Sequence, residues 1–104
     1  MNNKANKYEL KGKMFLWSAD SKTSRHFLPV DKSVAAKIKA NFGRYAVGFG
    51  SLPVRARVGD SEWLTSIFPD SKTNTYVLPV KKKIRKDQSI KAGDNVRFTI
   101  KIGG

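Results

Sequence analysis

The densest group of charged residues in the sequence is a basic run at positions 81 to 86. It comprises Lys81, Lys82, Lys83, Arg85 and Lys86, with Ile84 among them. We expect these residues in the first turns of a short helix, where a cation costs about 0.3 to 1 kcal/mol because the N-terminus is itself positive. An external anion would explain the arrangement, since it meets both the ammonium groups and free backbone N–H groups. A solvated lysine face, screened over about 8 to 10 Å, is the alternative.

Two further groups of residues are candidates for binding. Arg55 and Arg57 lie on the outward side of a predicted strand and would extend the basic patch, because paired guanidinium groups suit phosphates and guanine edges. Trp63, Thr65 and Ser66 are candidates for the lining of a pocket. The alternative for these three is a core strand with satisfied hydrogen bonds, which is the more common use of such residues.

The sequence contains no recognisable catalytic constellation. His26, the single histidine, lies between Arg25 and Phe27 in a predicted strand, which favours a packing or surface role over proton transfer. The aspartates fall at turn and cap positions. Cysteine is absent, and no metal-ligand cluster, phosphate loop or nucleophile motif occurs. We therefore predict a protein that is not an enzyme, with no catalytic residue, metal or cofactor.

An internal duplication positions these residues. Residues 20–34 and 70–84 are identical at eight of fifteen positions at an offset of 50, whereas unrelated segments share roughly one. Each copy is one supersecondary unit that buries its apolar side against the other. We predict that residues 13–47 superpose on 63–97 about a pseudo-two-fold axis. Asp31, a suitable helix N-cap, aligns with Lys81, so the two helices differ in charge where they begin.

Alternating apolar residues predict a mainly β chain. Strands are expected at 8–17, 25–30, 52–58, 62–68, 74–80 and 96–102, with one more through Tyr45, Val47 and Phe49. The 62–68 strand carries apolar side chains on both sides, which indicates burial on both. Helices are expected at 32–42 and 81–88. Short strands with frequent turn signals favour a small barrel, because closure removes exposed edges.

Length and charge limit the choice of function. The 104 residues suggest one domain at 8–104 after a loose lead-in at 1–7. The 21 Lys and Arg exceed the 8 Asp and Glu by 13, which favours an anionic partner. Solubility alone needs a net charge of only about 2 to 8. Without cysteine, a signal segment or an apolar run of about 18 residues, we predict a cytoplasmic protein with no membrane partner.

Several motifs carry a family resemblance. They are Gly50-Ser51-Leu52-Pro53-Val54-Arg55-Ala56-Arg57-Val58-Gly59, Trp63-Leu64-Thr65-Ser66-Ile67-Phe68-Pro69, Tyr76-Val77-Leu78-Pro79-Val80-Lys81 with Ile84-Arg85-Lys86, and Gly93-Asp94-Asn95-Val96. With them, almost all of the chain resembles a family catalogued only as a domain of unknown function, number nineteen-oh-five. The stretch from the Leu-Pro strand to Gly93-Asp94 also resembles one arm of the AbrB-type swapped-hairpin transcription factors, which are dimers. The resemblance implies a double-split β-barrel with both arms in one chain, and it implies no established activity.

Two functions are consistent with these observations, and an enzyme is a third and poorer option. The first is a small barrel that contacts nucleic-acid phosphates, of DNA or RNA, through residues 81–83, Arg85, Lys86, Arg55 and Arg57. The second is a binding module for a small ligand or a protein partner, basic for solubility or for an acidic partner. A deep pocket at Trp63 and Arg85 would favour the second. We expect a monomer in either case, because one chain supplies both arms.

Overall fold

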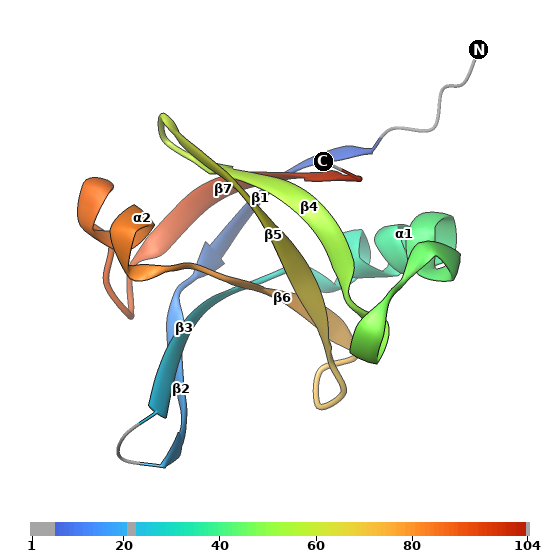
Figure 1. Ribbon diagram of the computed structural model, residues 1–104, viewed down its shortest axis with the longest axis horizontal. Coiled ribbons are helices and arrows are strands. Elements are labelled where there is room, and N and C mark those ends of the chain that lie inside the picture. The colour runs from blue at the N-terminus through green and yellow to red at the C-terminus, as the bar shows by residue number, and fades with distance from the viewer. Residues whose placement is uncertain (1–5, 21–22, 104) are drawn as a thin grey trace.

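The computed structural model describes residues 6–20 and 23–103, and within these ranges the chain is mainly β (Figure 1). The strands are β1 (Lys7–Lys13), β2 (Phe15–Asp20), β3 (Thr23–Pro29), β4 (Leu52–Val58), β5 (Ser61–Asp70), β6 (Thr75–Pro79) and β7 (Asn95–Ile102). The helices are α1 (Lys32–Phe42) and α2 (Lys82–Asp87), with two 3-10 turns, η1 (Gly43–Tyr45) and η2 (Gly48–Gly50). Both predicted helices are confirmed. None of the described helices is long and apolar enough to cross a membrane.

The strands form one curled antiparallel sheet in the order β1-β7-β4-β5-β6-β3-β2. The two edge strands of this order, β1 and β2, are consecutive in the chain and are separated only by Met14 (Figure 1). Gly12 permits β1 to approach β3 closely, because a Cβ there would lie 3.0 Å from atoms of Pro29. The prediction of a small, mainly β barrel-like fold with two short helices is confirmed.

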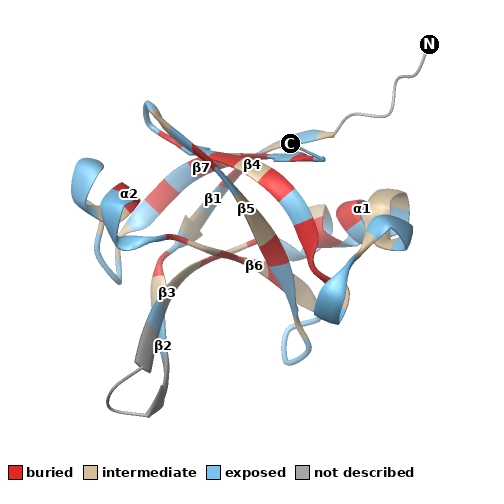
Figure 2. Ribbon diagram, in the orientation of Figure 1, coloured by how far each residue is buried: buried red, intermediate tan, exposed pale blue. Residues whose placement is uncertain are grey.

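Alternation along the strands separates a buried inner layer from an outer layer (Figure 2). Along β4, the four apolar positions are buried and the three between them are half-buried or exposed. The inner side chains form one hydrophobic core, to which α1 contributes Ile38 and α2 contributes Ile84. Burial of a large apolar side chain contributes about 1.5 to 3 kcal/mol to the free energy of folding. The inner side chains therefore stabilise the sheet, and the outer side chains are available for binding.

The β5 strand is buried on one side only, so the prediction of burial on both sides is wrong. Trp63 and Ile67 face the core, whereas the residues Leu64 and Phe68 are 67% and 37% exposed. The reason is that the sheet is a single curled layer, and the outer side of β5 faces solvent. Leu64 and Phe68 therefore form part of an exposed apolar surface on the outer side of this strand.

The pairing of β3 with β6 joins equivalent residues of the two repeat copies. Leu28 of β3 lies opposite Leu78 of β6, its counterpart at the 50-residue offset. The flanking backbone hydrogen bonds are also counterparts, from Val30 N to Tyr76 O at 2.9 Å and from Val80 N to His26 O at 3.0 Å. At this strand pair, each copy thus contributes equivalent backbone groups.

The hairpins beside this pair differ in register. Phe27 lies opposite Phe15, whereas its counterpart Val77 lies opposite Phe68, which aligns with Ser18. The two hairpins are therefore offset by three residues, the difference between positions 15 and 18. A superposition at a constant offset of 50 residues therefore cannot extend over both hairpins, and the pseudo-two-fold axis stays a prediction.

The strand predicted through Tyr45, Val47 and Phe49 is wrong. The chain forms η1 and η2 instead, and Phe49 has a φ of 59° with 99% of the residue exposed. Flanking glycines at 48 and 50 favour such tight turns. In addition, β4, which follows, already has β7 on one side and β5 on the other, so it offers no free edge to an extra strand.

The described chain enters the sheet slightly earlier than predicted. β1 begins at Lys7, within the expected lead-in, and Asn6 anchors its start. The backbone N–H of Ile102 donates to the Asn6 carbonyl at 2.8 Å, and the Asn6 amide donates to the Ile102 carbonyl at 3.2 Å. Lys7 is consequently a residue of the sheet surface.

Candidate functional site

The outer side of β1, β7 and β4 is strongly basic. Antiparallel register aligns Lys7, Lys101 and Arg55 in one row and Lys11 with Arg97 in another. We call this surface the basic face, and its seven cations are Lys7, Lys11, Lys13, Arg55, Arg57, Arg97 and Lys101. Two carboxylates, Glu9 on β1 and Glu62 on β5, lie in the row that contains Thr99 and Arg57. Strands lie about 4.8 Å apart and alternate residues about 6.8 Å apart, so the surface is a grid of mainly positive charge.

Arg55 and Arg57 are part of this grid. Arg57 Nε donates to the Gly59 carbonyl at 2.9 Å, which holds its guanidinium near the β4–β5 turn. Arg57, Lys11 and Arg97 also line a hollow of about 510 Å³ on the basic face. The Lys and Arg residues of β1 and β7 were not predicted as binding residues, because the alternation of apolar and polar residues was used only to locate the core. The polar positions of these two strands, which alternate with the buried ones, are the signal that identifies them.

The cations of residues 81–86 are divided between two environments. Lys81 occupies the N-cap position of α2 and makes no capping hydrogen bond with its side chain. Lys82, Lys83 and Lys86 are exposed on α2, where Lys83 Nζ forms an ion pair with Asp87 at 2.9 Å. Lys81 and Arg85 instead line a hollow beside β5. The predicted anion-binding set is thus spread over the basic face, the exposed side of α2 and this hollow.

The hollow lies where β5 and β6 diverge and has a volume of about 410 Å³. β5 pairs with β4 as far as Ile67 and with β6 only from Phe68, so earlier residues of β5 have no ladder to β6. Arg25, Lys81 and Arg85 line this hollow, which we call the Arg85 pocket, and its described lining includes no carboxylate. Three cations in a described lining without a carboxylate favour an anionic occupant.

Two of the three predicted pocket residues line the Arg85 pocket. They are Trp63, whose side chain is largely buried, and Thr65. Ser66 lies opposite Pro53 on the outer side of β5 and is not part of the lining. The structure therefore brings Trp63 and Arg85 together, from strands and helices that are distant in sequence.

Arg85 is held in place by two contacts. Its Nε donates to the Val80 carbonyl at 3.2 Å, and its Nη1 lies 3.4 Å from Nε2 of His26. Since a guanidinium carries no acceptor, Nε2 of His26 is the acceptor in this contact. Burial, and secondly the charge of Arg85, lower the pKa of His26. Both effects favour the neutral imidazole, the form whose Nε2 accepts from the guanidinium and orients it.

Four aromatic side chains gather on the outer side of β2, β3 and β5, and we call this surface the aromatic face: Phe15, Trp17, Phe27 and Phe68. The ring centroids of Phe15 and Phe27 lie 5.8 Å apart with an interplanar angle of 37°, a favourable aromatic arrangement. All four line a hollow of about 580 Å³, together with Arg25 and Lys72. The aromatic face thus combines apolar rings with cations at its border.

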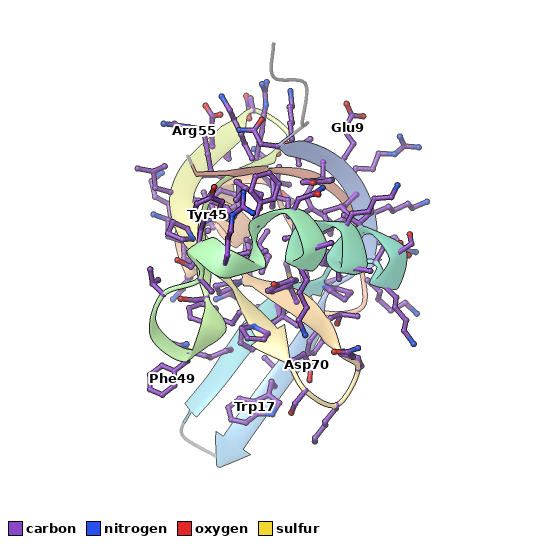
Figure 3. All side chains as sticks on the ribbon, turned by 90° about the vertical axis from the view of Figure 1, so that its right-hand side faces the viewer. Glu9, Trp17, Tyr45, Phe49, Arg55 and Asp70 are labelled. Atoms are coloured by element: carbon purple, nitrogen blue, oxygen red, sulfur yellow. The ribbon has the colours of Figure 1, made fainter. Side chains whose placement is uncertain are left out.

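The aromatic face was not predicted from the sequence. The signal is that Phe15 and Trp17 alternate out of phase with the buried Met14, so large apolar residues occupy both sides of one strand. Figure 3 shows how far the two surfaces are separated. Trp17 and Asp70 lie at the lower end of that view, whereas Arg55 and Glu9 lie at the upper end.

Fold and surfaces define a class of protein: a small, curled β domain whose outer side carries one basic and one aromatic surface. Its described residues contain no group of three or more His, Cys, Asp or Glu that could hold a metal ion. The chain belongs to the family described as Domain of unknown function (DUF1905), whose model matches residues 13–100. The match confirms the resemblance to this family, and it covers the aromatic face and four cations of the basic face, Lys13, Arg55, Arg57 and Arg97. No curated protein matches the chain.

Proposed function

We propose that this protein is a non-enzymatic domain that binds nucleic acid through its phosphates. The observation that carries the proposal is the basic face, where three adjacent strands present seven cations beside two carboxylates. The net charge of +13 adds a long-range attraction for a polyanion. His26, the single histidine, is assigned a positioning role in this proposal, because its Nε2 lies 3.4 Å from Nη1 of Arg85.

A polyanion suits this surface better than a small anion does. Duplex DNA carries one negative charge per about 1.7 Å of helix axis, so several cations of the grid meet phosphates at once. In Figure 1, neither α1 nor α2 lies over β7 and β4, which leaves their outer side accessible. Each neutralised phosphate releases counterions, and this release drives binding without regard to sequence.

A second candidate function follows from the Arg85 pocket. Trp63 supplies an aromatic wall, and three cations surround a volume of about 410 Å³. This arrangement favours a module that binds a small anionic ligand or an acidic side chain of a protein partner. The basic face would then serve solubility. The two functions differ in which residues control the affinity for a polyanion.

The salt dependence of duplex DNA binding tests the proposed function. If four to six phosphates are neutralised, log affinity falls against log salt with a slope of roughly −4 to −5. The double variant Lys11→Glu with Lys101→Glu removes two cations of the basic face. We expect it to reduce the steepness of that slope by about 2 and to weaken binding at 0.1 M salt by roughly fifty-fold.

A matched control separates the basic face from net charge. Lys37→Glu with Lys39→Glu makes the same charge change on exposed positions of α1. This control should keep most of the slope and affinity of the parent. Equal losses in both double variants would assign binding to net charge alone. Absence of binding to duplex, single strand, RNA and heparin at low salt would exclude nucleic acid as the partner and favour the second function.

We further propose that the protein acts as a monomer. In support of this, one chain supplies all seven strands of the described sheet, and its two edge strands, β1 and β2, are joined through Met14. Sedimentation at moderate salt should give the mass of one chain. A dimer that persists on dilution and exchanges strands would contradict this.

A further inference from the structure

The aromatic face and the Arg85 pocket are parts of one continuous surface. Arg25 and Phe68 line both hollows, so the two volumes of about 580 and 410 Å³ adjoin at these side chains. The rings remain accessible, since Trp17 is 48% exposed and Phe68 is 37% exposed. Exposed aromatic rings that gather in one place and border cations suggest a ligand with flat rings and negative charge.

We infer that this surface binds a single strand of nucleic acid, an inference that rests on the proposed function. Unpaired bases stack on Trp17 and Phe68, and the phosphates that follow them contact Arg25 and the Arg85 pocket. Base stacking on aromatic side chains tolerates any sequence, because every base has a flat π-face. The structure thus adds a surface for bases to the surface for phosphates.

The charges around the rings fit this occupant. The described lining of the two hollows includes the cations Arg25, Lys72, Lys81 and Arg85 and one carboxylate, Asp70. Asp70 is engaged locally, because its side chain accepts a hydrogen bond from the Lys72 N–H at 3.0 Å. The surface therefore complements an anionic ligand along its whole length.

The geometry favours a single strand over a duplex or a peptide. A duplex keeps its base faces inside the stack, where side chains cannot reach them. An acidic peptide would match the cations but offers no flat ring for each exposed aromatic. From β2 across β3 and β6 to β5 there are three strand spacings of about 4.8 Å, or about 14 Å. Four-stranded sheets of this width stack two or three bases in known single-strand-binding modules.

The test compares an oligothymidylate with a DNA duplex of the same length, using the full chain and variants whose folding is verified by circular dichroism. Trp17→Ala and Phe68→Ala should each weaken single-strand binding at least about five-fold, and should leave duplex binding unchanged. Trp17→Phe keeps a stacking ring and should retain most of the single-strand affinity. Arg25→Gln should remove about one phosphate contact and reduce the steepness of the single-strand salt slope by about 0.7.

Phe49→Ala is the matched control, because Phe49 is an exposed aromatic outside both hollows. It should bind both oligonucleotides like the parent. If Trp17→Ala and Phe68→Ala bind the single strand as well as the parent does, the inference is overturned while duplex binding by the basic face still stands. If the parent binds neither form, both proposals fail.

Polyglutamate serves as a probe for an acidic peptide. Loss of polyglutamate binding in Trp17→Ala, with oligothymidylate binding intact, would assign the surface to an acidic peptide instead.

Discussion

The basic face and the aromatic face are outer surfaces of the same curled sheet. Both lie above the same inner layer, and strand alternation separates both from that layer in the same way. On β1, β7 and β4 the outer residues are mostly Lys and Arg, whereas on β2, β3 and β5 they include four aromatic rings. The same sheet therefore presents two surfaces of different chemistry, one basic and one aromatic.

Because the two faces differ in this way, the contribution of charge and the contribution of base stacking to binding can be measured separately. Contacts to phosphates weaken steeply with salt, because they depend on counterion release. Stacking on an aromatic ring depends mainly on contact area and depends little on salt. A variant of one face should therefore change one of these properties and leave the other intact.

The largest expected effect comes from the layer that both faces share. Leu28 is completely buried at the centre of the β3–β6 pair, so Leu28→Ala should reduce the free energy of unfolding by about 2 to 5 kcal/mol. Leu78→Ala should cost a similar amount, because Leu78 is its direct partner and equally buried. Urea denaturation measures both. Costs below about 1 kcal/mol would show that this layer is not the common support of the two faces.

A smaller effect is expected from α2, whose exposed lysines lie on neither face. Lys82→Glu should weaken duplex binding by less than about ten-fold, because at most one phosphate contact is lost. The free energy of unfolding should stay constant or rise by a few tenths of a kcal/mol, since Glu replaces a cation at the helix N-terminus. Lys82 is preferable to Lys83, whose reversal would also place a carboxylate beside Asp87. A loss as large as that of the basic-face variant would extend the basic face to α2.

Phe49 tests whether an exposed aromatic ring outside the aromatic face contributes to binding. Its φ of 59° is unfavourable for any residue with a side chain, and 99% exposure leaves little burial to lose. Phe49→Gly should raise the free energy of unfolding by up to about 1 kcal/mol and leave binding unchanged. Thermal denaturation provides the comparison. Weaker single-strand binding by this variant would show that the aromatic face extends to η2.

Local signals predicted the helices, and distant contacts decided the surfaces. The start of α1 was predictable because Asp31 accepts hydrogen bonds from the N–H groups of Ser33 and Val34, two and three residues away. The surroundings of Arg55 were not, because Lys101 reaches it only through pairing of β4 with β7. Phe15 and Trp17 have apolar side chains that suit a core equally well. Only the curl of the sheet determines that their side faces outward.

The smallest expected effect concerns pH and the Arg85 pocket. Burial, followed by the charge of Arg85, lowers the pKa of His26 below its ordinary value of 6.5. As the pH falls below 6.5, the unfolded chain therefore binds a proton at His26 before the folded chain does. The state that binds more protons gains free energy, so the folded state loses stability in this window. The loss ends at the lower pH where folded His26 is protonated too.

His26→Gln isolates this contribution, because glutamine offers an acceptor to Arg85 and does not titrate. Unfolding by urea, measured at several pH values from neutral downward, should show a steeper loss of stability in the parent than in His26→Gln just below pH 6.5. Asp31 acts in a different window, since hydrogen bonds, first that from the Ser33 side chain, lower its pKa from 3.8, and its stabilising effect is lost only as the pH falls through that lower range. Well above pH 6.5, where His26 is neutral in both states, the two proteins should have parallel stability curves. Parallel curves below that pH as well would mean that Arg85 and burial exert no net influence on His26, and the guanidinium in the pocket would then need another explanation for its position.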